Sequence, residues 1–221
     1  MASRGHVVYR AVLVAGALAL AAVLWPRLPE RMPTHWGLDG RVDGWGGRFE
    51  GALLLPLLAL GIWALAEVLP RIDPRRANFA KMRGAYDVTI SAAVTMLVGL
   101  DAAMLASAVG YPVPVSRLAA AGTGVLLVVL GNLLPRARPN WWFGIRTPWT
   151  LSNDRVWTRT HRVGGYLMVA AGVALLVAAL ALPPAWSASA VVVAAVVAGL
   201  GSTVYSYVAW RQETKGMGPS S

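Results

Sequence analysis

Six apolar runs follow one another along this 221-residue chain, and each is long enough to cross a membrane as a helix. A helix needs about 20 predominantly apolar residues to span a hydrocarbon core of ~30 Å. Hydrophobic residues make up 57% of the chain and charged residues only 14%. The runs cover residues 8–25, 51–69, 86–109, 115–134, 166–182 and 186–210. The sequence therefore predicts an all-α integral membrane protein with about six transmembrane helices.

The basic residues predict an orientation, because Lys and Arg are retained on the cytoplasmic side during membrane insertion. With the N-terminus inside, all but five of the 20 Lys and Arg residues fall in cytoplasmic segments. The exceptions are Arg27, Arg31, Arg41, Arg48 and Arg117. Trp25-Pro26-Arg27 is a poor cleavage context for a signal peptide, so we expect the first run to be a retained span. Both the N- and C-termini are therefore predicted to be cytoplasmic.

The net charge of +10 restricts the partners and the possible chemistry. The cations lie in loops next to the membrane without a helix-turn-helix or zinc pattern, which favours an anionic lipid bilayer over direct nucleic acid binding. The chain has no cysteine, hence no disulfide, thiol nucleophile or thiolate metal site. It also lacks a Walker loop, a Rossmann fingerprint and common hydrolase motifs. We expect neither an enzyme nor a protein with a cofactor.

Two halves of three spans each are predicted. Residues 1–110 form an N-terminal half with an external loop at 26–50, and residues 111–221 form a C-terminal half with a cytoplasmic loop at 135–165. In the external loop, Asp39-Gly40 and Asp43-Gly44 predict two turns. His35, Asp39 and Asp43 supply possible metal ligands, but their spacing matches no EF-hand or zinc pattern, so we expect no metal site.

The cytoplasmic loop combines helix-breaking prolines with a basic helix. Pro135, Pro139 and Pro148 rule out one continuous helix in its first half. Ser152 is expected to cap a short amphipathic helix after them, and Gly164-Gly165 are expected to let that helix bend into the next span. Arginines recur on one face of this helix, and we expect this face to bind anionic lipid. These residues are Arg155, Arg159 and Arg162.

Both loops resemble known sequence families. The external loop resembles the DUF1648 module, and the matching residues are Leu28, Pro29, Pro33, His35, Trp36, Gly40 and Asp43. The cytoplasmic loop is similar to the signature of the SdpI family. That signature is matched by Gly131-Asn132, Asn140, the run FGIRTPWTLS from Phe143 to Ser152, and Trp157. The two modules occur in the family's usual order and cover most of the chain.

The SdpI resemblance implies a bacterial multi-pass protein of the cytoplasmic membrane that gives immunity to a secreted, membrane-active peptide toxin. It also implies a second role, in which the protein engaged by toxin recruits a cytoplasmic DNA-binding repressor. The external residues that we expect to meet the peptide are His35, Trp36, Asp39 and Asp43. The residues that we expect to signal at the inner face are Asn132, Asn140, Phe143, Arg146, Thr147, Trp149 and Trp157.

Polar residues near or within the spans leave two other functions open. Asp101 lies well inside the third span, where a carboxylate is costly and therefore functional or paired. Arg117 is one possible partner, and a protonated state that is hydrogen-bonded to a neighbouring helix is the other. A proton-coupled transporter or exporter would use Asp101, and a membrane enzyme would use an external site at His35 and Asp43.

Three further polar residues have local explanations. Glu67 and Asp87 are expected to form salt bridges with the nearby Arg71 and Arg83. His161 lies between arginines and is expected to face solvent.

Overall fold

Each predicted span forms one long helix. In the computed structural model, which describes residues 3–216, six helices are long and apolar enough to cross a membrane. They are α1 (Arg4–Leu24), α2 (Arg48–Ile72), α4 (Arg83–Ala108), α5 (Val115–Leu133), α7 (Asp154–Ala181) and α8 (Ser187–Gly216). The prediction of an all-α multi-pass membrane protein is confirmed.

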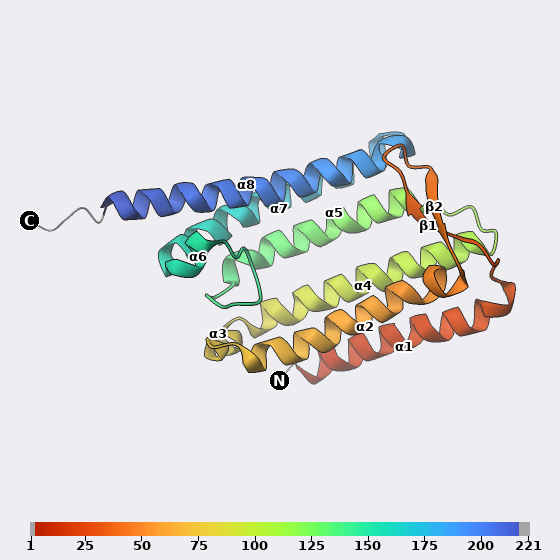
Figure 1. The fold of residues 1–221 in the computed structure, drawn as a ribbon, viewed down its shortest axis with the longest axis horizontal. Coiled ribbons are helices and arrows are strands. Elements are labelled where there is room, and N and C mark those ends of the chain that lie inside the picture. Colours follow the sequence, from red (N-terminus) through yellow and green to blue (C-terminus); the bar gives the residue numbers. More distant parts are fainter. Residues whose placement is uncertain (1–2, 217–221) are drawn as a thin grey trace, which may run out of the picture.

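Short elements join the long helices. They are η1 (Trp25–Arg27), β1 (Met32–Trp36), β2 (Val42–Gly46), α3 (Arg76–Lys81), η2 (Leu134–Arg136), α6 (Pro148–Ser152) and η3 (Pro184–Trp186). The β1–β2 hairpin lies at one end of the bundle, and α3, α6, the start of α1 and the end of α8 lie at the other (Figure 1). We call these the hairpin end and the terminal end. The side of the membrane that each end faces stays a prediction.

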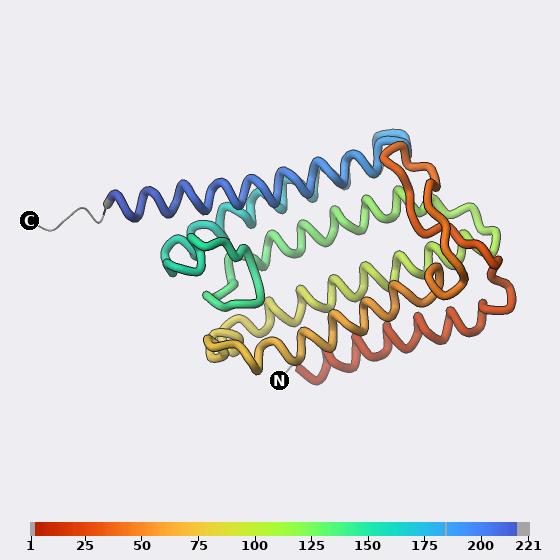
Figure 2. Tube along the Cα trace, viewed as in Figure 1, coloured from red at the N-terminus to blue at the C-terminus, as the bar shows by residue number. Residues whose placement is uncertain are grey.

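The long helices pack mainly in two groups. Helices α1, α2 and α4 pack together, as do α5, α7 and α8, and the contact between α4 and α5 joins the groups (Figure 2). The boundary between halves at residue 110 stays a prediction.

Small residues fill the interior, while large apolar residues point outward. Ala21, Ala52 and Ala59 are fully buried, whereas Val12 and Leu180 are 65% and 78% exposed. In a bilayer such outward Val and Leu side chains contact lipid, and close backbone approach between small residues stabilises the bundle. The distribution therefore fits a protein whose sides are covered by lipid.

Two local predictions around α7 were wrong. Ser152 ends α6 instead of capping the basic helix, and Asn153 caps α7 by accepting from the N–H groups of Arg155 and Val156. Gly164 and Gly165 do not bend the chain, because α7 runs unbroken from Asp154 to Ala181. Both glycines are buried instead, and Gly165 lies against the backbone of Gly131 on α5. Their lack of a side chain serves close helix packing.

Candidate functional site

The external loop folds as a small antiparallel hairpin, which the sequence analysis did not predict. Met32 pairs with Gly46 and Trp36 with Val42, and Gly40 has a φ of 74° in the connecting loop. The expected turn at Asp39-Gly40 is therefore present. The expected turn at Asp43-Gly44 is wrong, because both residues belong to β2. Fully buried Met32 anchors the hairpin against Gly51 of α2.

His35 and Asp43 form a polar pair on the hairpin surface. The Nδ1 atom of His35 lies 2.5 Å from Oδ1 of Asp43, and both side chains are more than half exposed. Asp39 instead accepts a hydrogen bond from the backbone N–H of Arg41. Such an exposed pair contributes little to the stability of the protein. Its position on the hairpin is therefore the better guide to its role.

A cavity of about 520 Å³ lies beneath the hairpin and extends between the parts of α2, α4, α5 and α8 nearest the hairpin end. Its volume is in the range of about 300–1,000 Å³ typical of ligand sites. His35, Trp36 and Asp43 line it, whereas the expected Asp39 does not. Apolar side chains such as Leu54 and Val191 line the part between the helices. The cavity can therefore accept a ligand that has both polar and apolar groups.

Asn140 organises the loop at the terminal end. Its side chain is 1% exposed. The Oδ1 atom accepts from the N–H groups of Trp142 and Phe143, at 2.8 and 2.6 Å, and Nδ2 donates to the carbonyls of Arg138 and Phe143, both at 2.8 Å. One buried amide thus satisfies backbone groups that no regular secondary structure pairs.

His161 fixes the next part of the loop. Its Nε2 accepts from the N–H of Ile145 at 3.0 Å, and its Nδ1 faces the carbonyl of Trp157 at 2.8 Å. This pattern requires a neutral imidazole with the proton on Nδ1. The expectation that His161 faces solvent was wrong, because the residue is fully buried. Gly144 has a φ of 108°, and a side chain there would meet the imidazole ring.

The sequence contained a signal for this burial. Position 161 is one helical turn after Trp157, on the face opposite the arginines. The two rings stack at 4.1 Å between centroids.

Thr147 and Thr150 connect the loop to α8. The N–H of Thr150 donates to Oγ1 of Thr147, and the N–H of Thr147 donates to Oγ1 of Thr150, which is the reciprocal arrangement of a capping box around Pro148. The Oγ1 of Thr147 also donates to Oγ of Ser206 on α8 at 3.0 Å. The start of α6 is therefore held to α8 by a buried hydrogen bond.

Residues from the N-terminal half dock onto the same loop. Buried Asp73, between α2 and α3, accepts at Oδ2 from the N–H of Trp141 at 2.8 Å, and Nδ2 of Asn78 donates to the carbonyl of Pro139 at 2.7 Å. The sequence analysis missed both residues, although the turn-forming Asp73-Pro74 pair was a signal.

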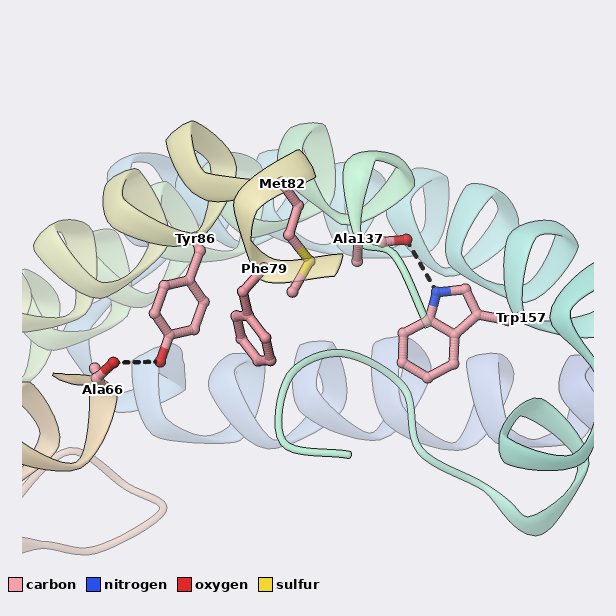
Figure 3. Close-up of a cluster of buried hydrophobic side chains, with 6 residues drawn as sticks. All are labelled: Ala66, Phe79, Met82, Tyr86, Ala137 and Trp157. Carbon is pink, nitrogen blue, oxygen red and sulfur yellow. Dashed lines mark hydrogen bonds between the residues drawn. The ribbon is translucent and has the colours of Figure 1, made fainter. Parts of the chain in front are cut away.

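An apolar cluster completes this contact, and it joins α2, α3 and α4 to the loop and α7 (Figure 3). Its buried members are Ala66, Phe79, Met82, Tyr86, Ala137 and Trp157. The indole Nε1 of Trp157 donates to the carbonyl of Ala137 at 2.9 Å. We call this assembly of loop, cluster and Asp73 the inner joint.

The expected signalling residues separate into two kinds. Asn140, Thr147 and Trp157 are buried, and Phe143 is partly buried against the cluster. They hold the inner joint together. The residues of the set that are at least partly open to a partner are Asn132, Arg146 and Trp149, together with the neighbouring Trp141 and Trp142.

The three arginines of the basic helix differ in their contacts. Arg155 and Arg159 lie 3.7 and 3.5 Å from the carboxylate of Glu213 on α8, whereas Arg162 is exposed. Lipid binding by this face stays a prediction, and Arg162 is the residue best placed for it.

Arg10 is the centre of a buried ion network that the sequence analysis missed. Its guanidinium group lies 3.3 Å from Glu67 and 3.2 Å from Asp87, and its Nε donates to Ser91. The expected pair of Arg83 with Asp87 is present at 3.5 Å. The expected partner of Glu67 was wrong, because Arg10 takes the place of Arg71.

Asp101 is 1% exposed, and among residues 3–216 neither of its carboxylate oxygens has a hydrogen-bond partner. Arg117 is not its partner, since that guanidinium group donates to the carbonyl of Leu182. The expected pairing with Arg117 was therefore wrong, and so was the alternative of a hydrogen bond to a neighbouring helix, which is absent among residues 3–216. An unpaired carboxyl group inside the membrane is costly, which marks Asp101 as a candidate functional residue.

Comparisons with known proteins find two matching regions in the chain. Residues 136–206 match the SdpI/YfhL protein family, and residues 12–60 match the domain of unknown function DUF1648. The chain is 25% identical over 161 residues to the immunity protein SdpI of Bacillus subtilis (strain 168), which is 73% of this chain and 75% of that protein. No solved structure matches the chain. The two matched regions include the hairpin and the part of the inner joint that the loop and α7 contribute, whereas Ala66, Asp73, Phe79, Met82 and Tyr86 lie outside them.

Proposed function

Because this chain belongs to the SdpI/YfhL protein family, we propose that it is an immunity protein of the bacterial cytoplasmic membrane that protects against a secreted, membrane-active peptide. The observation that carries this proposal is the similarity to an immunity protein over 73% of the chain. That similarity supports immunity in general, and the peptide target and its binding site are our inferences.

The hairpin end is the proposed docking site for the peptide. The cavity combines the exposed His35–Asp43 pair with apolar walls, and a membrane-active peptide has polar and apolar groups of its own. In the predicted orientation this end faces outward, where a secreted peptide arrives first. Trp36 lines the same cavity and can provide an aromatic contact.

Helix α8 is the proposed link between the two ends. At the hairpin end, Oγ of Ser189 donates to the carbonyl of Leu38 at 3.2 Å. At the terminal end, Ser206 accepts from Thr147, and the ring of Tyr207 lies 5.1 Å from that of Trp149. A small shift of α8 caused by a bound peptide would therefore reach the inner joint. We propose that exposed residues there, Arg146 among them, recruit a cytoplasmic DNA-binding repressor.

A protection assay tests the docking proposal. A peptide-sensitive bacterium expressing Trp36→Ala/Asp43→Asn should lose the protection that the wild-type chain provides. Asp39→Asn is the matched control, because Asp39 lies on the same hairpin but outside the cavity. Protection must be normalised to the amount of protein in the membrane. If the wild-type chain protects against no member of a panel of secreted membrane-active peptides, the immunity proposal fails.

Transport is the second candidate function, and Asp101 favours it, because it is buried and has no hydrogen-bond partner within residues 3–216. A proton-coupled transporter needs a carboxyl group that exchanges a proton, which asparagine cannot do. Asp101→Asn has nearly the same shape and carries no charge, so the protein should still fold. Full protection by this variant supports immunity without transport, whereas loss of protection at normal abundance supports the transport mechanism.

A further inference from the structure

A small pocket at the terminal end lies between α2, α3 and α4. Arg71 lies in the last turn of α2, Arg76 is the first residue of α3, and Arg83 is the first residue of α4. All three residues line the pocket. Three arginines from different elements thus border one space, although a turn or a helix separates them in the sequence.

The carboxylates in this pocket do not neutralise all of its arginines. Glu67 and Asp87 also line it, but both are paired with buried Arg10. The buried Nε of Arg83 lies 3.5 Å from a carboxylate oxygen of Asp87, yet it makes no hydrogen bond among residues 3–216. Within residues 3–216, Arg71 and Arg76 form no ion pair. The pocket therefore has an excess of positive charge and free donors.

Size and chemistry together indicate the class of ligand. The cavity volume is about 180 Å³, below the range of about 300–1,000 Å³ for drug-sized ligands. Guanidinium groups bind phosphate oxygens with two parallel hydrogen bonds, and arginine is preferred where such binding is needed. We propose that this pocket binds a phosphate group, presented by the headgroup of an anionic phospholipid or as a free anion. The proposal does not depend on immunity or on the Arg155–Arg162 face.

Native mass spectrometry of the detergent-purified full chain tests the proposal. Wild-type protein should retain phosphatidylglycerol in preference to phosphatidylcholine, whose choline neutralises the phosphate. The Arg71→Gln/Arg76→Gln variant should bind phosphatidylglycerol about 25-fold more weakly, because each of the two cations near an anionic lipid contributes roughly a fivefold factor. The control, Arg211→Gln/Lys215→Gln, removes the same charge from α8 outside the pocket and should change binding much less.

A thermal-shift titration with inorganic phosphate, at constant ionic strength against chloride, distinguishes the sources. Stabilisation of the wild type by phosphate, reduced in the Arg71→Gln/Arg76→Gln variant, identifies a free anion as a ligand. A preference for phosphatidylglycerol without that stabilisation identifies the lipid. Arg71→Lys/Arg76→Lys keeps the charge and should retain part of the binding. This variant replaces the Gln variant in the test if the Gln variant does not fold. The proposal is overturned if the α8 control loses as much binding as the Arg71→Gln/Arg76→Gln variant. It is also overturned if the wild type binds neither phosphatidylglycerol nor inorganic phosphate.

Discussion

Gly131 on α5 and Gly165 on α7 meet through their backbones, since a Cβ atom on either residue would lie 2.6 Å from the carbonyl oxygen of the other. Gly124 and Gly172 meet in the same way on the same two helices, with corresponding distances of 2.9 and 2.6 Å. Any larger residue at these positions would push the helices apart. Membrane helices depend on such close approach because burial of apolar surface from water does not drive their association.

Gly165→Ala should therefore destabilise the protein by about 2 kcal/mol or more, because the backbone atoms that the new Cβ atom would meet cannot move aside. Overpacking a protein core typically costs about 1–3 kcal/mol. Thermal unfolding in detergent measures the effect. Gly99→Ala in α4 is the control, because a Cβ atom there meets nothing within 4 Å. It should be neutral or slightly stabilising. Equal destabilisation by both substitutions would contradict the packing explanation.

Replacing Asn140 should loosen the inner joint. Asn140→Ala removes four hydrogen bonds from buried backbone and side-chain groups, and at about 1 kcal/mol each the loss is about 3–4 kcal/mol. Hydrogen exchange of the amides of residues 138–147 should accelerate in this variant. Asn132→Ala is the matched control, since exposed Asn132 makes one hydrogen bond within its own helix. A slow, unchanged exchange after Asn140→Ala would show that other contacts hold the loop.

Arg10 should be essential for stability. Arg10→Gln leaves Glu67 and Asp87 without their buried counterion, and breaking a buried ion pair costs about 3–5 kcal/mol. Arg4→Gln removes the same charge from an exposed position of the same helix and should have little effect. Protein abundance in membranes and thermal unfolding measure the difference. Similar behaviour of the two variants would mean that the network contributes little.

The basic face of α7 should bind anionic lipid mainly through Arg162. Arg162→Gln should weaken binding to vesicles containing phosphatidylglycerol by about fivefold, or about 1 kcal/mol. Arg155→Gln should have a smaller effect, because Arg155 is paired with Glu213. Co-sedimentation of the protein in nanodiscs with such vesicles provides the measurement. The opposite order of effects would argue that the Glu213 pairs do not form in the membrane.

Topology can be tested with single cysteines, because the chain contains none. Arg41→Cys on the hairpin and Ser152→Cys at the end of α6 are both exposed positions. An impermeant thiol reagent added to intact cells should label the first and not the second, as the arginine distribution predicts. Labelling of both from outside would contradict the six-span orientation.

The sequence by itself determined the spans and the break between them. Apolar runs of sufficient length must cross the bilayer as helices, because a helix satisfies its own backbone hydrogen bonds in lipid. The irregular loop could also be predicted, because each proline restricts the backbone only at its own position and at the residue before it. These prolines are Pro135, Pro139 and Pro148. The motif residues from Phe143 to Ser152 indicated the family, because a motif of consecutive residues can be recognised without knowledge of the tertiary structure.

Only the tertiary structure decided which polar residues are buried and what they contact. Arg10 becomes the partner of Glu67, Asp101 has no hydrogen-bond partner among the described residues, and Gly165 serves packing instead of bending. These outcomes depend on how each helix is rotated against its neighbours. A sequence of nearly uniform apolar helices gives a weak signal for that rotation. Close backbone contacts and a few buried hydrogen bonds between distant segments, such as that of Asp73 with Trp141, set the rotation and thereby build the inner joint.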